Sequence, residues 1–328
     1  MEKRLTGLLK KFIKKIKTKK NILIATHIDP DCDGICSALA MAKFVYLCKK
    51  IKPSLFCISP IPEKYGFLLE DFKFSTRLKP FDLLITVDSA GLERILPENK
   101  FNLKKISAGK DIINIDHHES NKPFGNIAII DEKASSTCEI IYKIFTSLNF
   151  KINQSLAQII YAGIYNETGG FVYPNTTADS LRICADLITL NINPAAVAKN
   201  LNAKTIAGTK LLSTVLQTIK VKQGIGTMYL TKNMLKNTKA QMSESENFIS
   251  FLQAIKNVRL SVFFREEKNE IRISLRSDGI IDVNEFAGKF GGGGHRLAAG
   301  IRIKGNIFHI IKKISGDLNR IIKDVHHK

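Results

Sequence analysis

The sequence lacks the cysteine patterns of a disulfide framework or a zinc finger. Its six cysteines form no CxxC pair and show no finger or ribbon spacing. Five of them sit within apolar or helical patterns, where a free cysteine behaves as a small hydrophobic residue. We therefore expect reduced thiols, as in the cytoplasm.

Membrane and export signals are also missing. No apolar run reaches the length needed to span a bilayer, and the N-terminus has no apolar signal-peptide region followed by a cleavage site. We find no internal repeats and no low-complexity tract beyond the basic ends. These absences predict a soluble, cytoplasmic protein.

Acidic residues are few relative to basic ones. The 328 residues carry 50 Lys+Arg against 30 Asp+Glu, a formal net charge of +20. This balance favours polyanionic partners, nucleic acid first among them, and a general bias toward lysine is the alternative. The chain is 44% hydrophobic and 24% charged, as in a globular protein, and its length suggests two domains.

Basic residues are dense at the N-terminus. Residues 1–20 contain nine Lys or Arg, and Leu5, Leu9, Phe12 and Ile16 recur at helical spacing. This pattern predicts a basic amphipathic helix. We expect its apolar stripe to pack on the first domain; contact with an RNA backbone or a membrane surface is the alternative.

Three apolar runs suited to buried strands, 21–26, 83–87 and 112–115, each end at acids or histidines. The residues that follow them are His27, Asp29, Asp31, Asp33, Asp88, Asp116, His117 and His118. Ligands gather beyond the carboxyl ends of strands in an open parallel sheet, so these side chains are expected to meet. Nitrogen and oxygen ligands suit divalent transition ions, which predicts a metal site. The alternative is that the acids only form turns and caps.

Two helices are predicted after these strands, from about 135 to 148 and from 154 to 165. The second ends at Asn166 and Glu167, just before two glycines, which makes Glu167 a candidate for a further oxygen ligand. Residues 174–177 resemble a turn that caps another helix over 178–190.

The second half of the chain changes character. Residues 195–245 are helical and polar with a strand-like stretch at 226–230, and we place a domain boundary between residues 190 and 220. Residues 258–264 and 271–277 show the period-two pattern of strands, and a charged hairpin loop separates them. A helix around 283–290 leads into four consecutive glycines and His295. Such a run can cradle an anion through its backbone amides, or it can be a flexible link.

Together these motifs resemble the DHH/DHHA1 phosphoesterase family, and most closely its short branch of nanoRNases that also act on 3′-phosphoadenosine 5′-phosphate (pAp). The resemblance covers roughly residues 20–305. The matching segments, in the family's order, are His27-x-x-Pro30-Asp31-x-Asp33, Val87-Asp88, Asp116-His117-His118, Gly163-Ile164-x-x-Glu167-Thr168-Gly169, Ser274-x-Arg276-Ser277 and Gly291-Gly292-Gly293-Gly294-His295.

The resemblance implies an α/β fold, in which a parallel-sheet DHH domain precedes a smaller DHHA1 domain with a mixed sheet, and the substrate lies between them. The expected limits are 1–20 for the basic helix, 21–195 for the DHH domain, 196–220 for a helical linker and 221–328 for the DHHA1 domain. A homodimer is also what the family suggests.

The resemblance also implies a role for each site residue. Two divalent ions, expected to be Mn²⁺, would share Asp88 and activate a water molecule. The first would be held by His27, Asp31 and Asp88, and the second by Asp33, Asp88, His117 and Glu167. His118 would contact the scissile phosphate, and Asp116 would orient a neighbouring histidine. The substrate would be bound by Ser274, Arg276, Ser277, Gly292, Gly293, Gly294 and His295.

Two positions depart from the family pattern. The family normally carries Asp where this chain has Glu167, which reaches one methylene further and is expected to shift or weaken the second metal site. It often carries glycine where this chain has Cys32.

The expected activity is the release of nucleoside 5′-monophosphates from very short RNAs, together with removal of the 3′-phosphate of pAp. A phosphodiesterase of cyclic or linear dinucleotides is the nearest alternative, because it would use the same residues. A non-catalytic nucleotide-binding or RNA-binding protein is the alternative of a different class, with Glu167 as the sign of a decayed site.

Overall fold

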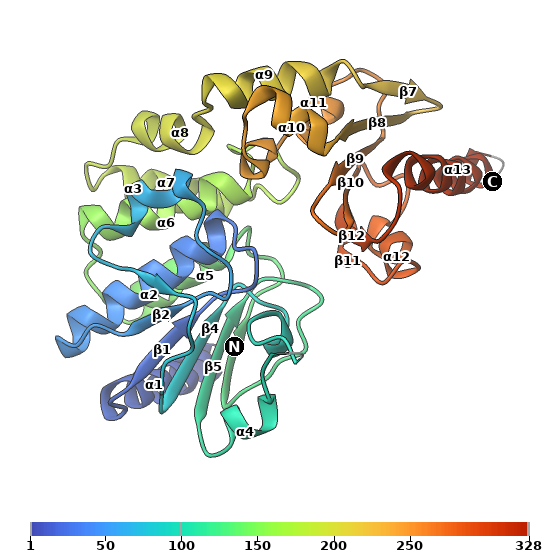
Figure 1. The fold of residues 1–328 in the computed structure, drawn as a ribbon. Coiled ribbons are helices and arrows are strands. Elements are labelled where there is room, and N and C mark those ends of the chain that lie inside the picture. Colours follow the sequence, from blue (N-terminus) through green and yellow to red (C-terminus); the bar gives the residue numbers. More distant parts are fainter. Residues whose placement is uncertain (1, 99, 327–328) are drawn as a thin grey trace. The chain divides into compact units, whose positions relative to one another are not determined.

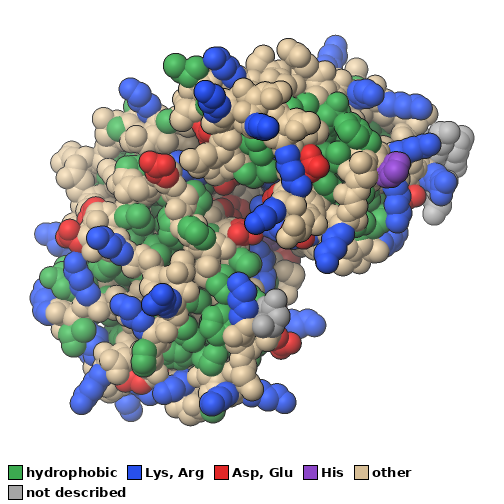
Figure 2. All heavy atoms as spheres, in the orientation of Figure 1, with side chains coloured by type: hydrophobic (Ala, Val, Ile, Leu, Met, Phe, Trp, Pro, Cys, Tyr) green, Lys and Arg blue, Asp and Glu red, His purple; other side chains and the backbone are tan. Residues whose placement is uncertain are grey.

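The computed structural model describes residues 2–98 and 100–326, and the chain forms two units, Met1–Ala203 and Lys204–Lys328 (Figure 1). Lys and Arg side chains are scattered over the face of both units that Figure 2 displays, as the net charge of +20 requires. Within the described residues, the longest helices are too polar to cross a lipid bilayer.

The first unit is built on sheet A, a parallel sheet of six strands in the order β3-β2-β1-β4-β5-β6. Its strands are β1 Ile22–Ala25, β2 Ser54–Phe56, β3 Phe74–Ser75, β4 Leu83–Val87, β5 Asp111–Asp116 and β6 Ile127–Ile130. The central strands β1 and β4 are buried along their whole length, which explains their unbroken apolar runs.

Helices cover both faces of sheet A. The larger core lies between the sheet and α1 Glu2–Thr18, α2 Cys32–Lys49 and α5 Thr137–Ser147, with α6 Gln154–Glu167, α7 Ala178–Ile188 and α8 Pro194–Asn202 behind them (Figure 1). The other face carries a smaller core that includes residues of η2 Leu92–Arg94 and α4 Leu103–Ser107. The turns η1 Glu63–Tyr65 and α3 Gly66–Leu69 contribute Tyr65 and Leu68 to the larger core.

The N-terminal helix α1 packs as expected. Leu9, Phe12 and Ile16 are buried in the larger core. On its polar side, Nζ of Lys15 lies 2.5 Å from Oδ1 of Asp111, and Lys19 pairs with the other carboxylate oxygen. The predicted packing is therefore confirmed for these three residues, and the side chain of Leu5 lies outside the described part of the chain.

The second unit is built on sheet B, with the order β11-β12-β10-β9-β8-β7. Within the described part of sheet B, β8–β9 is the one parallel pair and the other pairs are antiparallel, so this sheet is mixed. The strands are β7 Lys220–Lys222, β8 Ile225–Leu230, β9 Leu260–Glu266, β10 Ile271–Ser277, β11 Gly293–His295 and β12 Ala298–Ile303. The predicted α/β fold, with one parallel and one mixed sheet, is confirmed.

The two faces of sheet B have different partners. One packs on α12 Val283–Gly288 and α13 Ile307–His326 in the main core of this unit. Part of the other packs on α9 Ile206–Leu216 and α11 Ile249–Gln253. The remaining segments are α10 Lys232–Thr238 and η3 Met242–Ser245.

The glycine run is part of the sheet. Gly293 and Gly294 pair with β12 as part of β11. A Cβ atom at Gly292 or Gly294 would overlap the carbonyl oxygen of Gly300 or of Ala298. The interpretation of this run as a flexible link is therefore wrong, because close backbone packing requires glycine at two of its positions.

Smaller differences from the sequence-based elements lie at boundaries. Helix α6 continues through Asn166 and Glu167, so Glu167 is in its last turn and does not follow it. Thr177 caps α7 in a capping box with Ser180, as the sequence predicts. The stretch 195–245 contains a second strand, β7, whose exposed sequence Lys-Val-Lys gave no apolar signal.

Candidate metal centre

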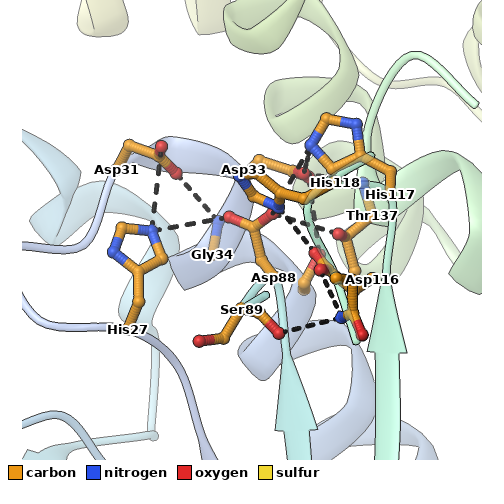
Figure 3. A network of polar contacts seen from close by, with 12 residues as sticks. His27, Asp31, Asp33, Gly34, Asp88, Ser89, Asp116, His117, His118 and Thr137 are labelled. Atoms are coloured by element: carbon orange, nitrogen blue, oxygen red, sulfur yellow. Dashed lines mark hydrogen bonds and ion pairs between the residues drawn. The ribbon is translucent and has the colours of Figure 1, made fainter. Parts of the chain in front are cut away.

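The polar residues that follow β1, β4 and β5 meet at the carboxyl edge of sheet A (Figure 3). Strands β1 and β4 are neighbours in the sheet although β2 and β3 come between them in the chain, so a topological switch point lies between them. His27 follows β1 and Asp88 follows β4, and Nε2 of His27 lies 3.6 Å from Oδ2 of Asp88. The strand ends converge as the sequence predicts.

The first group of ligand atoms comes from His27, Asp31 and Asp88, which lie within 4.8 Å of one another. Nε2 of His27 is 3.8 Å from Oδ2 of Asp31. The other ring nitrogen, Nδ1, contacts the carbonyl oxygen of Ile28 at 2.8 Å, and this contact fits Nδ1 as the donor. Nε2 is then the nitrogen that faces the carboxylates and remains available to a metal ion.

The second group comes from Asp88, His117 and His118. Oδ1 of Asp88 lies 3.6 Å from Nε2 of His117 and 3.8 Å from Nδ1 of His118. Nδ1 of His118 is also 2.7 Å from Oδ1 of Asp116. That nitrogen already has a hydrogen-bond partner, so His117 is the better metal ligand of the two histidines.

Asp88 belongs to both groups. Its Oδ2 faces His27 and its Oδ1 faces His117, while its side chain is only 2% exposed. Its φ of +55° is left-handed, a conformation that Asp tolerates better than most residues. The structure thus gives Asp88 the geometry of a carboxylate that can reach two cations.

Asp33 lies beside the second group, with Oδ2 4.0 Å from Nε2 of His117. Its carboxylate also accepts hydrogen bonds from the backbone N–H groups of Thr137 at 2.7 Å and Cys138 at 3.0 Å. These groups belong to the first turn of α5, where backbone donors are free and the helix dipole favours an anion. Asp33 is therefore held at the second group by a helix N-terminus.

Glu167 is in neither of the two groups that the described residues form. It lies in the last turn of α6, and its carbonyl oxygen accepts a hydrogen bond from Nδ2 of Asn175 at 3.1 Å. Its part as a metal ligand stays a prediction.

The electrostatics of these groups favour a cation. Burial alone would lower the pKa of His27, but the hydrogen bonds and charges of Asp31 and Asp88 raise it to about 10. Burial raises the pKa of Asp33, and the charges of Asp88 and Asp31 raise it further, well above its usual range. The crowded carboxylates repel one another, and a divalent ion would relieve this repulsion.

The space among the ligands is kept free. A Cβ atom at Gly34, in the first turn of α2, would lie 3.1 Å from Oδ2 of Asp88 and 3.4 Å from Nε2 of His27 and would overlap Oγ1 of Thr26. Thr26 is fully buried, and its Oγ1 has no hydrogen-bond partner among the described residues. Imidazole nitrogens and carboxylate oxygens grouped in this way fit a divalent transition ion.

Comparison with known proteins agrees with this geometry. Residues 21–164 match the DHH family, N-terminal domain, and residues 226–326 match the DHHA1 domain. The chain belongs to the DHH/DHHA1 phosphoesterase family. The first match ends at residue 164, before Glu167, and the second contains the whole glycine run.

Members of the family resemble this chain over most of its length. The bifunctional oligoribonuclease and PAP phosphatase NrnA of Bacillus subtilis is 28% identical over 295 residues, 89% of this chain and 92% of the relative. An exopolyphosphatase-related protein from Bacteroides fragilis has a TM-score of 0.88 at 25% identity and covers 98% of each chain. RecJ from Thermus thermophilus in complex with Mn²⁺ shares the fold, with a TM-score of 0.52 at 13% identity over 98% of this chain and 54% of that one.

Sequence reasoning missed several residues that support the DHH ligands. Oγ1 of Thr137 donates to Oδ1 of Asp88 at 3.1 Å. Nδ2 of Asn121 contacts Oδ2 of Asp116 at 2.6 Å and the carbonyl oxygen of Ser89 at 3.2 Å. The start of a helix at Thr137 was a usable signal for anion binding, whereas nothing in the sequence marked the loop residue Asn121.

In the DHHA1 domain, the register of sheet B brings most of the predicted substrate residues to one face. Ser274 and Arg276 are two residues apart on β10 and therefore lie on the same face. Arg276 is opposite Ala298, and Ala298 is opposite His295. Ser277 lies on the opposite face and is buried, and its Oγ accepts a hydrogen bond from the N–H of Gly279 at 3.0 Å. Ser277 thus forms a turn and does not join Ser274, Arg276 and His295.

Proposed function

We propose that this chain is a Mn²⁺-dependent phosphoesterase that releases nucleoside 5′-monophosphates from very short RNAs and removes the 3′-phosphate of pAp. One observation carries the proposal: the two carboxylate oxygens of Asp88 face two separate groups of ligands. The printed activities of the Bacillus subtilis relative supply the substrate class, and the Mn²⁺ in the RecJ structure supplies the ion.

The DHH residues would hold two ions. His27, Asp31 and Asp88 would bind one, and Asp33, Asp88, His117 and Glu167 would bind the other. When bound, such a pair of ions supplies charge neutralisation for the phosphate and a water of lowered pKa. Asp88 would fix the spacing of the pair because each of its oxygens serves one side.

His118 is the residue that we place against the scissile phosphate. Its Nδ1 is 2.7 Å from Oδ1 of Asp116, and Asp116 is itself held by Asn121. A ring nitrogen that donates to this buried carboxylate fixes the orientation of the ring and leaves Nε2 for the substrate. Burial alone would lower the pKa of His118, but Asp116 and Asp88 raise it, so the ring is suited to donate to a phosphate oxygen.

The test is product release in Mn²⁺ from an RNA dinucleotide, from pAp and from a cyclic dinucleotide. Asp88→Asn keeps the shape of the side chain and removes its charge. We expect it to reduce kcat on the dinucleotide and on pAp by at least ~1000-fold, because both ions would lose a ligand.

Asp179→Asn is the matched control, since Asp179 is exposed on α7 and pairs only with Arg182, at 2.9 Å, among the described residues. Turnover of the cyclic compound in preference to the other two would replace the proposal with the dinucleotide phosphodiesterase. Nucleotide binding by the wild type without any turnover would favour the non-catalytic alternative.

A further inference from the structure

The predicted substrate residues of sheet B are part of a larger ordered face. Three rows of directly opposed residues run across β9, β10 and β12, and the first two of these rows also reach β11. The β9 members of these rows are buried, and Phe263 is part of the core with α9 and α11, so we call only the β10, β11 and β12 part of this surface the open face of sheet B. The rows are Ser261, Arg276, Ala298 and His295, then Phe263, Ser274, Gly300 and Gly293, then Arg265, Arg272 and Arg302.

The middle row leaves space beside Ser274. A Cβ atom at Gly300 would meet only the carbonyl oxygen of Ile273, at 3.7 Å, and one at Gly293 only Oδ1 of Asn284, at 3.6 Å. Unlike Gly292 and Gly294, these glycines are not required by backbone packing. They keep the surface next to the Ser274 hydroxyl low enough for a ligand to approach.

Arg265 lies at the inner end of the third row and is only 7% exposed. Its guanidinium is 5.4 Å from the centre of the Phe263 ring, and its Nη2 donates to Oγ of Ser274 at 3.2 Å. Its Nε is buried and has no hydrogen-bond partner among the described residues. The side chain therefore runs beneath Ser274 and ends at its hydroxyl.

The charge of Arg265 is poorly compensated. No carboxylate of the described residues is within ion-pair distance of it; Glu267 and Glu246 attract it only from further away. Arg272 stands directly opposite on β10, and like charges in that position repel. Burial and the charge of Arg272 lower the pKa of Arg265 to about 10. A buried cation without a partner is unfavourable, and an anion on this face would supply the missing charge.

Packing alone does not explain why an arginine occupies position 265. An apolar side chain of similar length could fill the same space against Phe263 without the desolvation of a charge. Arg302, in the same row, shows the ordinary arrangement, since it pairs with Glu267 at 3.0 Å and with Glu270. The chain thus keeps a neutralised arginine at the edge of the row and an unneutralised one beneath Ser274.

The hydrogen bond to Arg265 has a consequence for Ser274. Because the Ser274 oxygen accepts from Nη2, its own proton is free to point away from the sheet, toward the open face. A hydroxyl oriented in this way donates to an anion. The anion would also meet the positive charges of Arg272 and Arg276, which lie on either side of Ser274 along β10.

We propose that Arg265 is a positioning residue for a phosphate-binding site on the open face, where it holds the Ser274 hydroxyl as a donor to the non-scissile 5′-phosphate of the substrate. The inference rests on the proposed function for the identity of the substrate. In pAp and in a 5′-phosphorylated dinucleotide alike, the phosphate that is not cleaved is the 5′ one. The site thus explains how one DHHA1 domain would accept both substrates.

The experiment compares Arg265→Met and Arg265→Lys with the wild type on two RNA dinucleotides, one with a 5′-phosphate and one with a 5′-hydroxyl. Arg265→Met should raise KM for the 5′-phosphorylated dinucleotide by about 10-fold, the loss of one charge-assisted hydrogen bond, and leave kcat within about twofold. KM for the 5′-hydroxyl dinucleotide should not change. Arg265→Lys keeps the charge and a donor and should recover part of the loss.

Arg302→Met is the control, because it removes the same charge from the same row at a position that is already ion-paired. The melting temperature separates binding from folding: Arg265→Met should leave it unchanged or raise it, since an unpaired buried charge is removed. A fall of several degrees, or an equal rise of KM on both dinucleotides, would overturn the inference.

A binding measurement keeps this test independent of the proposed activity. Adenosine 5′-monophosphate and adenosine are titrated into the full chain in EDTA, so that catalysis is not needed. The site requires tighter binding of the monophosphate by the wild type and a loss of that preference of about 10-fold in Arg265→Met. Absence of any preference in the wild type would reject the site even if the enzyme hydrolyses RNA, and a preference without turnover would reject only the proposed function.

Discussion

Gly34 lies in the first turn of α2, directly beside the carboxylate of Asp88. Elsewhere in a helix, glycine is less favourable than alanine by about 1 kcal/mol, because it loses more backbone freedom on folding. Here a methyl group would overlap Oγ1 of Thr26 and approach Asp88 and His27. The absence of a side chain at Gly34 thus leaves space for the metal ion that we expect Asp88 and His27 to bind.

We expect Gly34→Ala to weaken Mn²⁺ binding by at least about 10-fold and to lower the free energy of unfolding by ~1–3 kcal/mol, because Thr26 and Asp88 must move. Mn²⁺ titration by calorimetry and urea unfolding check the two effects. Gly316→Ala is the control, since Gly316 is in α13 with nothing within 4 Å of an added Cβ, and it should stabilise the protein. Unchanged Mn²⁺ affinity in Gly34→Ala would show that the space beside Asp88 is not used.

The sequence was informative about ligands that follow strands and uninformative about their supports. His27, Asp88 and His117 could be predicted because the change from an apolar run to polar residues marks the end of a buried strand. The carboxyl ends of parallel strands then lie at one edge of the sheet. Asn121 and Arg265 act through single side-chain contacts, Asn121 with Asp116 and Arg265 with Ser274 across the β9–β10 hairpin, and the apolar pattern of a strand does not reveal such contacts. Ser277 is different: it is three residues from Ser274, so the period of two already places it on the other face.

At the scale of whole elements, α1 illustrates two forces of unequal size. Its attachment to the first unit comes mainly from the burial of Leu9, Phe12 and Ile16, a contribution of about 1.5–3 kcal/mol for each fully buried side chain. The ion pairs of Asp111 with Lys15 and Lys19 add little, because solvent-accessible pairs contribute at most ~1 kcal/mol. These ion pairs orient α1 against the start of β5 and contribute little to the stability of its attachment.

Asp111→Asn should therefore lower the free energy of unfolding at pH 7 by less than about 1 kcal/mol. Hydrogen bonds from Lys15 and Lys19 hold the pKa of Asp111 below its ordinary value of 3.8. For a carboxyl with a lowered pKa, the stabilisation is complete above the unfolded-state pKa and is lost as the pH falls through the folded-state pKa. Urea unfolding of wild type and variant should differ at pH 7 and converge as the pH falls below 3.8 and through the folded-state pKa. A difference that persists in acid would mean that the carboxylate charge is not the cause.

The boundaries of elements were predicted well where capping residues occur, as at Thr177 and Ser136. The glycine run was ambiguous because four glycines have no side-chain pattern that distinguishes a loop from an edge strand. Its structure is decided by β12, whose carbonyl groups at Ala298 and Gly300 come too close for any other residue at Gly294 and Gly292. Pairing with a strand elsewhere in the chain thus settled what local sequence left open.

At the scale of the whole molecule, each unit has its own hydrophobic core. The residues of sheet A and its helices form two clusters within Met1–Ala203, and those of sheet B form two others within Lys204–Lys328. Every ligand atom in the two groups around Asp88 belongs to the first unit. A unit with its own core and a complete set of ligands is expected to fold and bind metal by itself.

We therefore predict that a fragment of residues 1–203 folds alone and is stabilised by Mn²⁺, whereas a fragment of residues 204–328 folds alone and is not. At a Mn²⁺ concentration 100 times the dissociation constant, binding to the native state adds ~2.7 kcal/mol, which corresponds to a rise in melting temperature of roughly 5–10 °C. Calorimetric melting of each fragment with and without the ion measures this difference. Asp88→Asn in the first fragment is the control, because it weakens both groups while the core stays intact. An equal rise in that variant, or in residues 204–328, would place the stabilising ion outside the carboxyl edge of sheet A.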